Sequence, residues 1–419
     1  MAADPLTRSR AGQVLPARPG SRPGRAGRAF GVVLALLVLL VLAARVGLLG
    51  PASVGLPVAL LAVFAGCAVA LTRTRALAFR LLAAAGALVA SSAFGISLVN
   101  HYYDYYLSWS ALGSDLAADN GASARPALIP VLHPQVDAHR PAPHPGRSGP
   151  GRVVTVPIPG TASGVVGRTA LVWLPAQYDD PRYAAAHFPV LELLHGDPGE
   201  PRSWLTLDLT AVLDQQAARA ANDPTVIVMP DVNGGFHNQQ CLNAPGAPQL
   251  DTYLARDIPA GLTAGLRIDP PGPHWAVGGL SSGGYCAARL ALHYPHQFGA
   301  AAIMDGYFHP DLAKSLRQRL YGKGPVRAGD DPTRLLASFP AGEPLPAFWI
   351  MAGTANATQY HEAITFATAI ARRQDLRFLT VIGGRHTPPA WRAALPDLLR
   401  WAAATVHGQT SNGQAAIPL

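Results

Sequence analysis

Residues 274–294 read HWAVGGLSSGGYCAARLALHY, and the first conclusions about the fold start from this stretch. HWAVGG has the pattern of a strand and YCAARLALHY that of a helix. Between them, residues 279–283 fit G-x-S-x-G, which at a sharp strand-to-helix turn forms a nucleophile elbow. The glycines let the backbone turn, and the helix N-terminus adds partial positive charge. The pattern predicts Ser281 as a nucleophile. Ser282 lacks the same flanking positions, and the alternative is a glycine-rich turn with an idle serine.

The sequence on both sides of the elbow alternates short apolar runs with helical stretches. Such alternation predicts a mainly parallel sheet with helices on both faces. We therefore expect an α/β-hydrolase domain over residues 152–407. The expected strands are Val153–Ile158, Thr169–Leu174, Val190–Leu194, Thr225–Met229, Trp275–Gly278, Ala300–Met304, Ala347–Met351 and Phe378–Ile382. The expected helices are Leu207–Ala221, Tyr253–Ala264, Ser282–His293, Tyr360–Arg373 and Pro389–Thr405.

A serine needs a base to become a good nucleophile. In α/β-hydrolases the chain order is serine, acid, histidine, so the histidine should follow the last strand. The run LRFLTVIGGRHTPPAW places His386 directly after that strand, and Gly383 and Gly384 allow the loop to fold back toward the sheet. We predict His386 as the base.

The sequence offers two candidates for the acid of the triad. An acid usually follows the strand before the histidine strand, but the first suitable position there holds Asn356. Glu362 is the carboxylate close behind, and we expect it to orient His386. Its other role would be a helix acid favoured by the helix dipole. Asp305, after the strand that ends at Met304, is the second candidate.

An oxyanion hole needs backbone N–H donors. One should come from Ser282, the residue after the nucleophile. The stretch LELLHGDPGEPRSW follows a predicted strand and has the H-G-x form of an oxyanion loop. We expect the second donor to be the Asp197 N–H, with Gly196 as the alternative, and His195 to have a structural role.

The first hundred residues predict a membrane anchor. Hydrophobic residues make up 49% of the chain and charged residues only 14%, which suggests that part of it lies in lipid. Residues 1–29 form a basic, disordered tail, and apolar runs follow at 30–49, 53–71 and 76–98. Each run is long enough to span a bilayer, so residues 30–100 are expected to form three transmembrane helices.

Orientation follows from the basic residues. With three spans, the arginine-rich tail and the Arg73/Arg75 loop lie on the same side of the membrane. Because both are basic, the positive-inside rule makes this the cytoplasmic side. We therefore expect a multi-pass cell-membrane protein with its catalytic domain outside the cell. Residues 101–151 would form an interfacial segment and a Pro/Gly-rich linker, and 408–419 a flexible tail. The alternative is a cleaved signal peptide.

Three stretches resemble a known family: DTYLARDIPAGL, WAVGGLSSGGYCAARLALHYPHQF and the closing GGRH. They are similar to the esterase family that includes esterase D and the secreted actinobacterial mycolyltransferases. The resemblance implies acyl-ester chemistry, with Ser281 as nucleophile and His386 as base. Glu362 resembles the helix glutamate of the mycolyltransferase branch. Asn356 stands where the esterase D branch has an aspartate, which is a departure from that branch.

The family comparison also bears on two cysteines. Cys286 lies one turn into the elbow helix, and Cys241 lies in a loop after the strand expected beside the elbow strand. Disulfides are permitted outside the cell. We therefore predict a Cys241–Cys286 disulfide, with two buried free thiols as the alternative.

These observations favour an extracytoplasmic serine esterase or acyltransferase that forms an acyl-enzyme on Ser281. Its expected substrate is an acyl ester, with a lipid or glycolipid as a candidate. The sequence has no CxxC, no metal-ligand spacing, no phosphate-binding loop and no basic stripe with aromatics, so we expect no cofactor, metal or nucleic-acid partner. The alternative is a catalytically inactive hydrolase-like domain that binds a cell-envelope component. A transporter is disfavoured because the spans contain no acidic residue. The oligomeric state, the acyl acceptor and the choice between hydrolase and transferase stay open.

Overall fold

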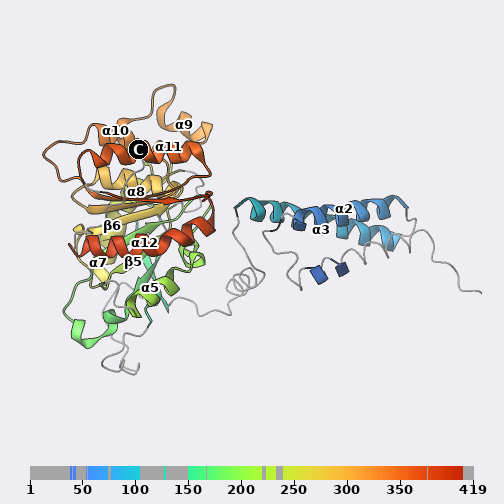
Figure 1. The fold of residues 1–419 in the computed structure, drawn as a ribbon, viewed down its shortest axis with the longest axis horizontal. Helices are drawn as coiled ribbons and strands as arrows, with labels where there is room; N and C mark the ends of the chain where they lie inside the picture. Colours follow the sequence, from blue (N-terminus) through green and yellow to red (C-terminus); the bar gives the residue numbers. More distant parts are fainter. Residues whose placement is uncertain are drawn as a thin grey trace, which may run out of the picture. The chain divides into compact units, whose positions relative to one another are not determined.

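Figure 1 shows the computed structural model of the chain. It describes residues 38–39, 41–43, 53, 55–73, 77–103, 127–128, 150–166, 168–218, 223–232, 239–374 and 376–408. The chain divides into two compact units, Met1–Leu116 and Ala117–Leu419, which are considered separately.

The first unit contains two long apolar helices, α2 (Gly55–Arg73) and α3 (Leu77–Tyr103). They pack on each other around a small cluster of Val63, Cys67 and Ala90. By length and composition alone, both helices could cross a membrane. They correspond to the second and third predicted spans. The first predicted span, 30–49, falls almost entirely outside the described residues, as do the basic tail and the linker, so three transmembrane helices are not shown.

The second unit is built on one nine-stranded sheet in the order β1-β2-β3-β5-β4-β6-β7-β8-β9. Strands β5, β4, β6, β7, β8 and β9 are mutually parallel, whereas β3 is antiparallel to both β2 and β5. The mostly parallel sheet of an α/β-hydrolase is confirmed. The strands are β1 (Ala127–Leu128), β2 (Arg152–Ile158), β3 (Arg168–Leu174), β4 (Val190–Leu194), β5 (Val226–Pro230), β6 (Gly272–Leu280), β7 (Phe298–Met304), β8 (Ala347–Gly353) and β9 (Arg377–Val381).

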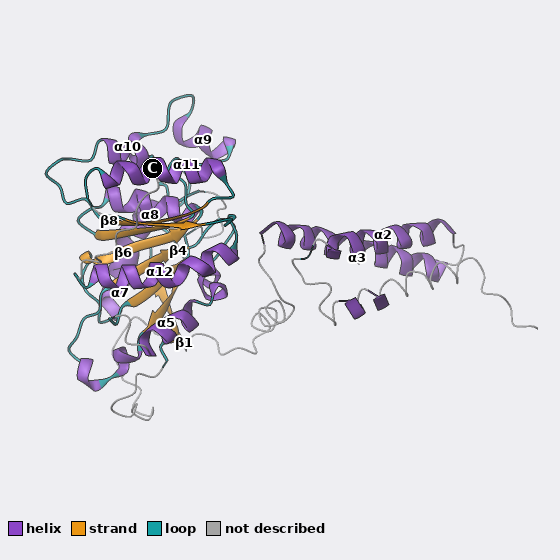
Figure 2. Ribbon diagram, in the orientation of Figure 1, coloured by secondary structure: helices purple, strands orange, loops and turns teal. Residues whose placement is uncertain are grey.

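Helices cover both faces of this sheet (Figure 2). One core includes residues of α8 and α11, and the other includes residues of α5 and α12. Apolar side chains fill both layers because parallel strands are buried on both faces. The helices are α5 (Leu209–Ala218), α6 (Leu250–Thr252), α7 (Ile258–Gly265), α8 (Ser282–His293), α9 (Lys314–Tyr321), α10 (Pro332–Ala337), α11 (Ala357–Ala371) and α12 (Pro388–Val406). A π-helical turn, η4 (Tyr253–Asp257), precedes α7, and 3-10 turns are η1 (Ala176–Asp179), η2 (Pro181–Tyr183), η3 (Pro201–Leu207) and η5 (Ala328–Asp330).

The carboxyl ends of β4, β6, β7 and β9 meet at one edge of the sheet, where α/β folds place their ligands. The turns after these strands contain Gly196, Ser281, Asp305 and His386 respectively. Each predicted strand is present to within a few residues, and α8 has the bounds that were predicted for it. The segment between β7 and β8 contains two helices that were not predicted, α9 and α10.

Candidate active site

Ser281 occupies the sharp turn between β6 and α8, with φ 55° and ψ −121°. Two glycines make this turn possible. A Cβ at Gly279 would lie 2.1 Å from the Gly283 carbonyl oxygen, and a Cβ at Gly283 would lie 2.2 Å from the Leu194 carbonyl oxygen. Real Cβ atoms do not approach backbone so closely, so both positions need glycine. The strand–turn–helix geometry of a nucleophile elbow is therefore present at Ser281.

His386 lies beside this serine. Its Nε2 is 2.9 Å from Ser281 Oγ, which is hydrogen-bond distance. The histidine follows β9 through a tight turn in which Gly383 has φ 68° and the Gly384 N–H donates to the Val381 carbonyl. The imidazole also meets the Trp391 ring edge to face, with ring centroids 5.1 Å apart. The structure thus brings together the predicted nucleophile and the predicted base.

The carboxylate next to His386 belongs to Asp305, which follows β7. Asp305 Oδ2 lies 2.9 Å from His386 Nδ1, and its side chain is 2% exposed. The two atoms do not meet the angular requirement of a hydrogen bond, and the contact becomes an ion pair when the imidazole takes up a proton. The Trp391 indole N–H donates to the same oxygen at 3.2 Å. The second of the two predicted acids therefore completes the line from Ser281 through His386.

Glu362, the first choice for the acid, lies elsewhere. No hydrogen bond or ion pair joins Glu362 to His386 in the part of the chain that the structure describes. The reason is the position of α11. Asn356 caps this helix by accepting from the Gln359 N–H at 3.2 Å, so Glu362 falls in the second turn. Helical rise carries it about 1.5 Å per residue away from the sheet edge. The geometry therefore favours Asp305 over Glu362 as the partner of His386.

The loop after β4 packs directly against the nucleophile. A Cβ at Gly196 would lie 3.3 Å from Ser281 Cβ, so the loop backbone closely approaches the serine. Buried His195 fixes this loop: its Nε2 accepts from the Val232 N–H at 3.0 Å, and its Nδ1 lies 2.7 Å from the Gly196 carbonyl oxygen. The accepting Nε2 leaves the ring proton on Nδ1, which donates to Gly196. This is the structural role expected of His195.

Tyr307 is a residue near the site that sequence reasoning did not single out. Its ring stacks on Tyr285 of α8, with centroids 5.4 Å apart. Burial, followed by the nearby carboxylates of Asp311 and Asp197, raises the pKa of the Tyr307 phenol. The phenol therefore stays protonated close to the loop that follows β4. In the sequence, only its position two residues after the candidate acid Asp305 could have pointed to Tyr307.

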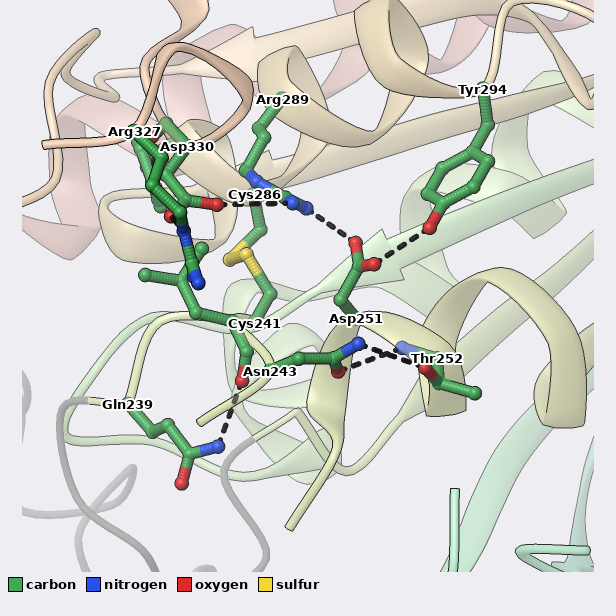
Figure 3. Close-up of polar contacts among 12 residues, drawn as sticks. Gln239, Cys241, Asn243, Asp251, Thr252, Cys286, Arg289, Tyr294, Arg327 and Asp330 are labelled. Carbon is green, nitrogen blue, oxygen red and sulfur yellow. Dashed lines mark hydrogen bonds and ion pairs between the residues drawn. A yellow bond between two sulfur atoms is a disulfide. The ribbon is translucent and has the colours of Figure 1, made fainter. Parts of the chain in front are cut away.

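Cys241 and Cys286 form the predicted disulfide, which joins the loop after β5 to α8 (Figure 3). The same helix holds a buried ion pair that was not predicted. The Arg289 guanidinium donates to Asp251, and it lies 3.4 Å from Asp330. A buried arginine needs such partners because an unpaired charge in the interior is costly. Disulfide and ion pairs together fix α8, and with it the turn that presents Ser281.

No group of three His, Cys, Asp or Glu side chains able to hold a metal ion occurs within the described ranges. At the active-site edge, Ser281, His386 and Asp305 lie in line.

Comparison with known families adds to this geometry. The family model described as "Putative esterase" matches residues 167–411, which include the elbow, Asp305 and His386. The chain belongs to this esterase family. Given the elbow and this family, it is a serine hydrolase of the esterase type.

Three relatives come from Corynebacterium glutamicum and Mycobacterium tuberculosis. An uncharacterized protein of Corynebacterium glutamicum is 28% identical over 296 residues, which span 66% of this chain and 68% of that protein. The MPT51/MPB51 antigen of Mycobacterium tuberculosis is 34% identical over 85 residues, or 20% of this chain and 28% of the antigen. An esterase of Mycobacterium tuberculosis is 29% identical over 129 residues, or 30% of this chain and 27% of the esterase.

Solved structures share the fold. A ferulic acid esterase has a TM-score of 0.52 at 19% identity, covering 61% of this chain and 99% of its own. A fluorophosphonate-binding serine hydrolase of Staphylococcus aureus has a TM-score of 0.52 at 17% identity, again covering 61% of this chain and 99% of its own. At these identities the likeness shows a common fold and leaves the substrate of this chain open.

Proposed function

We propose that this protein is an extracytoplasmic serine esterase or acyltransferase that acts on acyl esters through an acyl-enzyme on Ser281. The observation that carries the proposal is the line of three side chains at the sheet edge. Ser281 Oγ lies 2.9 Å from His386 Nε2, and His386 Nδ1 lies 2.9 Å from Asp305 Oδ2. These contacts have the order and spacing of a serine–histidine–aspartate triad.

Each group then has a defined task. His386 Nε2 takes the Ser281 proton as the oxygen attacks the acyl carbon, and Asp305 stabilises the imidazolium and fixes its orientation. The tetrahedral intermediate collapses when His386 returns that proton to the departing alcohol oxygen. The acyl group is left as an ester on Ser281. Water or a second hydroxyl compound then attacks this ester with His386 again as base, which releases the acyl product and restores the serine.

The oxyanion of the tetrahedral intermediate would rest on the backbone N–H groups of Ser282 and Asp197. Two observations support this assignment. Ser282 is the first residue of α8, where unpaired helical N–H groups gather. Asp197 directly follows Gly196 in the loop after β4, and the Gly196 backbone lies against Ser281. Preorganised donors of this kind often contribute more to the rate than any other single group.

The extracytoplasmic location is supported by the N-terminal unit and by the disulfide. Helices α2 and α3 are long and apolar enough to cross a membrane, and the apolar run at residues 30–49 is the proposed third span. The arginines before that run favour a cytoplasmic N-terminus, and three spans would then place the hydrolase domain outside the cell. The Cys241–Cys286 disulfide suits an oxidising compartment. A membrane-anchored esterase outside the cell would meet acyl esters of the envelope, so a lipid or glycolipid is the proposed substrate class.

Active-site labelling of the full chain tests the proposal. The purified protein in detergent should react with a fluorophosphonate probe, and peptide mapping should find the adduct on Ser281. Ser281→Ala should abolish both labelling and hydrolysis of a short p-nitrophenyl ester, whereas Ser282→Ala should keep labelling. A wild-type protein that neither labels nor hydrolyses the ester would favour an inactive binding domain, whereas a Ser281→Ala variant with full hydrolysis would rule out Ser281 as the nucleophile. Product analysis with water and sugar acceptors then separates hydrolase from transferase.

A further inference from the structure

The segment between β7 and β8 contains a concentrated basic surface. Residues 312–329 hold five basic residues and no acidic one: Lys314, Arg317, Arg319, Lys323 and Arg327. All five side chains are exposed. Three of them lie on α9, none of whose residues is buried. We call these five side chains the α9 basic surface.

Most of this charge is not used inside the domain. Arg327 forms an ion pair with Asp330 at 2.7 Å, and Arg317 lies over the Tyr321 ring at 5.8 Å. Within the described part of the chain, Lys314, Arg319 and Lys323 form no ion pair with a carboxylate. Leu316 and Leu320 are half-buried, so the leucine side of α9 faces the protein while the cations face outward. Because the leucines face the protein and the cations face solvent, the positive charge of α9 is available to an anionic partner.

The α9 basic surface belongs to the active-site side of the sheet. Its segment begins directly after Asp305, at the carboxyl end of β7. Two apolar side chains are unusually exposed at the same edge, Ile382 after β9 and Val166 between β2 and β3, each with 90% of its surface free. The edge that contains the catalytic line thus also presents cations and exposed aliphatic groups. Proteins that rest on a bilayer combine the same two features.

We propose that the α9 basic surface docks the hydrolase domain on anionic lipid headgroups, so that the active-site edge faces the bilayer. The inference rests on the proposed membrane location of the protein. The charge complementarity comes from the four cations that pair with no carboxylate in the described part of the chain, and the chain itself contains two helices fit to lie in that bilayer. Basic residues near an anionic surface each strengthen docking by about fivefold. A docked edge would let an acyl ester pass from the membrane to Ser281 without crossing water.

Hydrogen exchange of the full chain in lipid nanodiscs tests the docking. Amides of residues 312–329 should exchange more slowly in discs of phosphatidylcholine with phosphatidylglycerol than in discs of phosphatidylcholine alone. The protection should disappear in about 1 M salt, where the screening length falls to about 3 Å. Lys314→Gln with Arg319→Gln should weaken the docking equilibrium by about 25-fold, from two cations at about fivefold each.

A matched variant controls for charge alone. Arg372 and Arg373 are exposed at the end of α11, at the opposite edge of the sheet, so Arg372→Gln with Arg373→Gln should keep full protection. Three results would overturn the proposal. They are equal exchange in the two kinds of disc, an equal loss of protection in the two double variants, and protection that salt does not remove. Protection that appears only with soluble polyphosphate would also overturn it, in favour of a soluble polyanion. Fluorophosphonate labelling of the same samples reports the catalytic site separately, so the failure of one proposal leaves the other standing.

Discussion

His386 Nδ1 and Asp305 Oδ2 lie 2.9 Å apart, although their strands are not neighbours in the sheet. Asp305 follows β7 and His386 follows β9, with β8 between them. The acid therefore comes from the strand beside the nucleophile strand instead of the strand beside the histidine strand. The end of β8 has no triad residue, and Asn356 at that end caps α11.

This relationship predicts which carboxylate the activity needs. Asp305→Asn should lower kcat by about a thousandfold or more, because the amide no longer holds the imidazole in the right tautomer or stabilises its charge. Glu362→Gln is the matched control and should keep an activity close to the wild-type value. Ester hydrolysis by both variants checks the prediction. A large loss in Glu362→Gln with a mild effect of Asp305→Asn would contradict the geometry.

The elbow glycines should be indispensable for stability. Gly283→Ala places a Cβ 2.2 Å from the Leu194 carbonyl oxygen, so the backbone must shift. We expect the free energy of unfolding to fall by about 3 kcal/mol, the upper end of what overpacked interiors typically lose. Gly342→Ala, which meets nothing within 4 Å, should stay within about 0.5 kcal/mol of wild type. Urea unfolding measures both, and similar stabilities for the two variants would refute this account.

Glu192 on β4 should make stability depend on pH. Its side chain is fully buried and neither oxygen has a hydrogen-bond partner among the described residues, so desolvation raises its pKa to about 8. The folded protein then keeps a proton that the unfolded chain releases near its ordinary pKa of about 4.5. Stability from this group is full below about pH 4.5 and falls by about 1.4 kcal/mol per pH unit up to about pH 8.

Glu192→Gln should remove that slope and leave the variant more stable than wild type at pH 8. Urea midpoints at pH 5 and pH 8 give the comparison. Glu362→Gln, in a half-exposed position, should retain the wild-type slope. An unchanged slope in Glu192→Gln would mean that Glu192 is already ionised in the folded state.

The disulfide should contribute measurably to stability. Cys241 and Cys286 are 45 residues apart, and a closed loop of that length stabilises a fold by about 4 kcal/mol on the chain-entropy account. Replacing both cysteines by serine should lower the free energy of unfolding by about that amount. Reductant should destabilise the wild type to the same level and leave the double variant unchanged. Recovery of two free thiols by non-reducing peptide mapping of the native protein would show that the bond does not form.

Much of the fold could be predicted from local patterns. Apolar runs of strand length gave β4 with its observed bounds, and G-x-S-x-G with a following helix gave Ser281 and α8. Those features depend on neighbours in sequence. The Cys241–Cys286 pair was also within reach, because the strand order places one loop beside one helix.

Local sequence patterns could not identify the triad acid. Which carboxylate reaches His386 depends on three strand ends that converge in space, and Asp305 and Glu362 both fit the required chain order. Asp305 also has a left-handed φ of 53°, which no sequence pattern around it announces. Likewise, the run VLELL correctly predicted a strand, but only packing shows that Glu192 has no partner.

The supports of Asp305 have a consequence for how this enzyme can change. Its backbone N–H donates to Met351, its carbonyl accepts from Gln359, and its carboxylate accepts from Trp391. All three partners lie beyond residue 346, outside the segment that joins β7 to β8. Within that segment, the exposed helix α9 can therefore diverge in length and charge while the carboxylate stays in place. Asp330 is the fixed point of the segment, because it accepts from Arg289 and so supports the helix that presents Ser281.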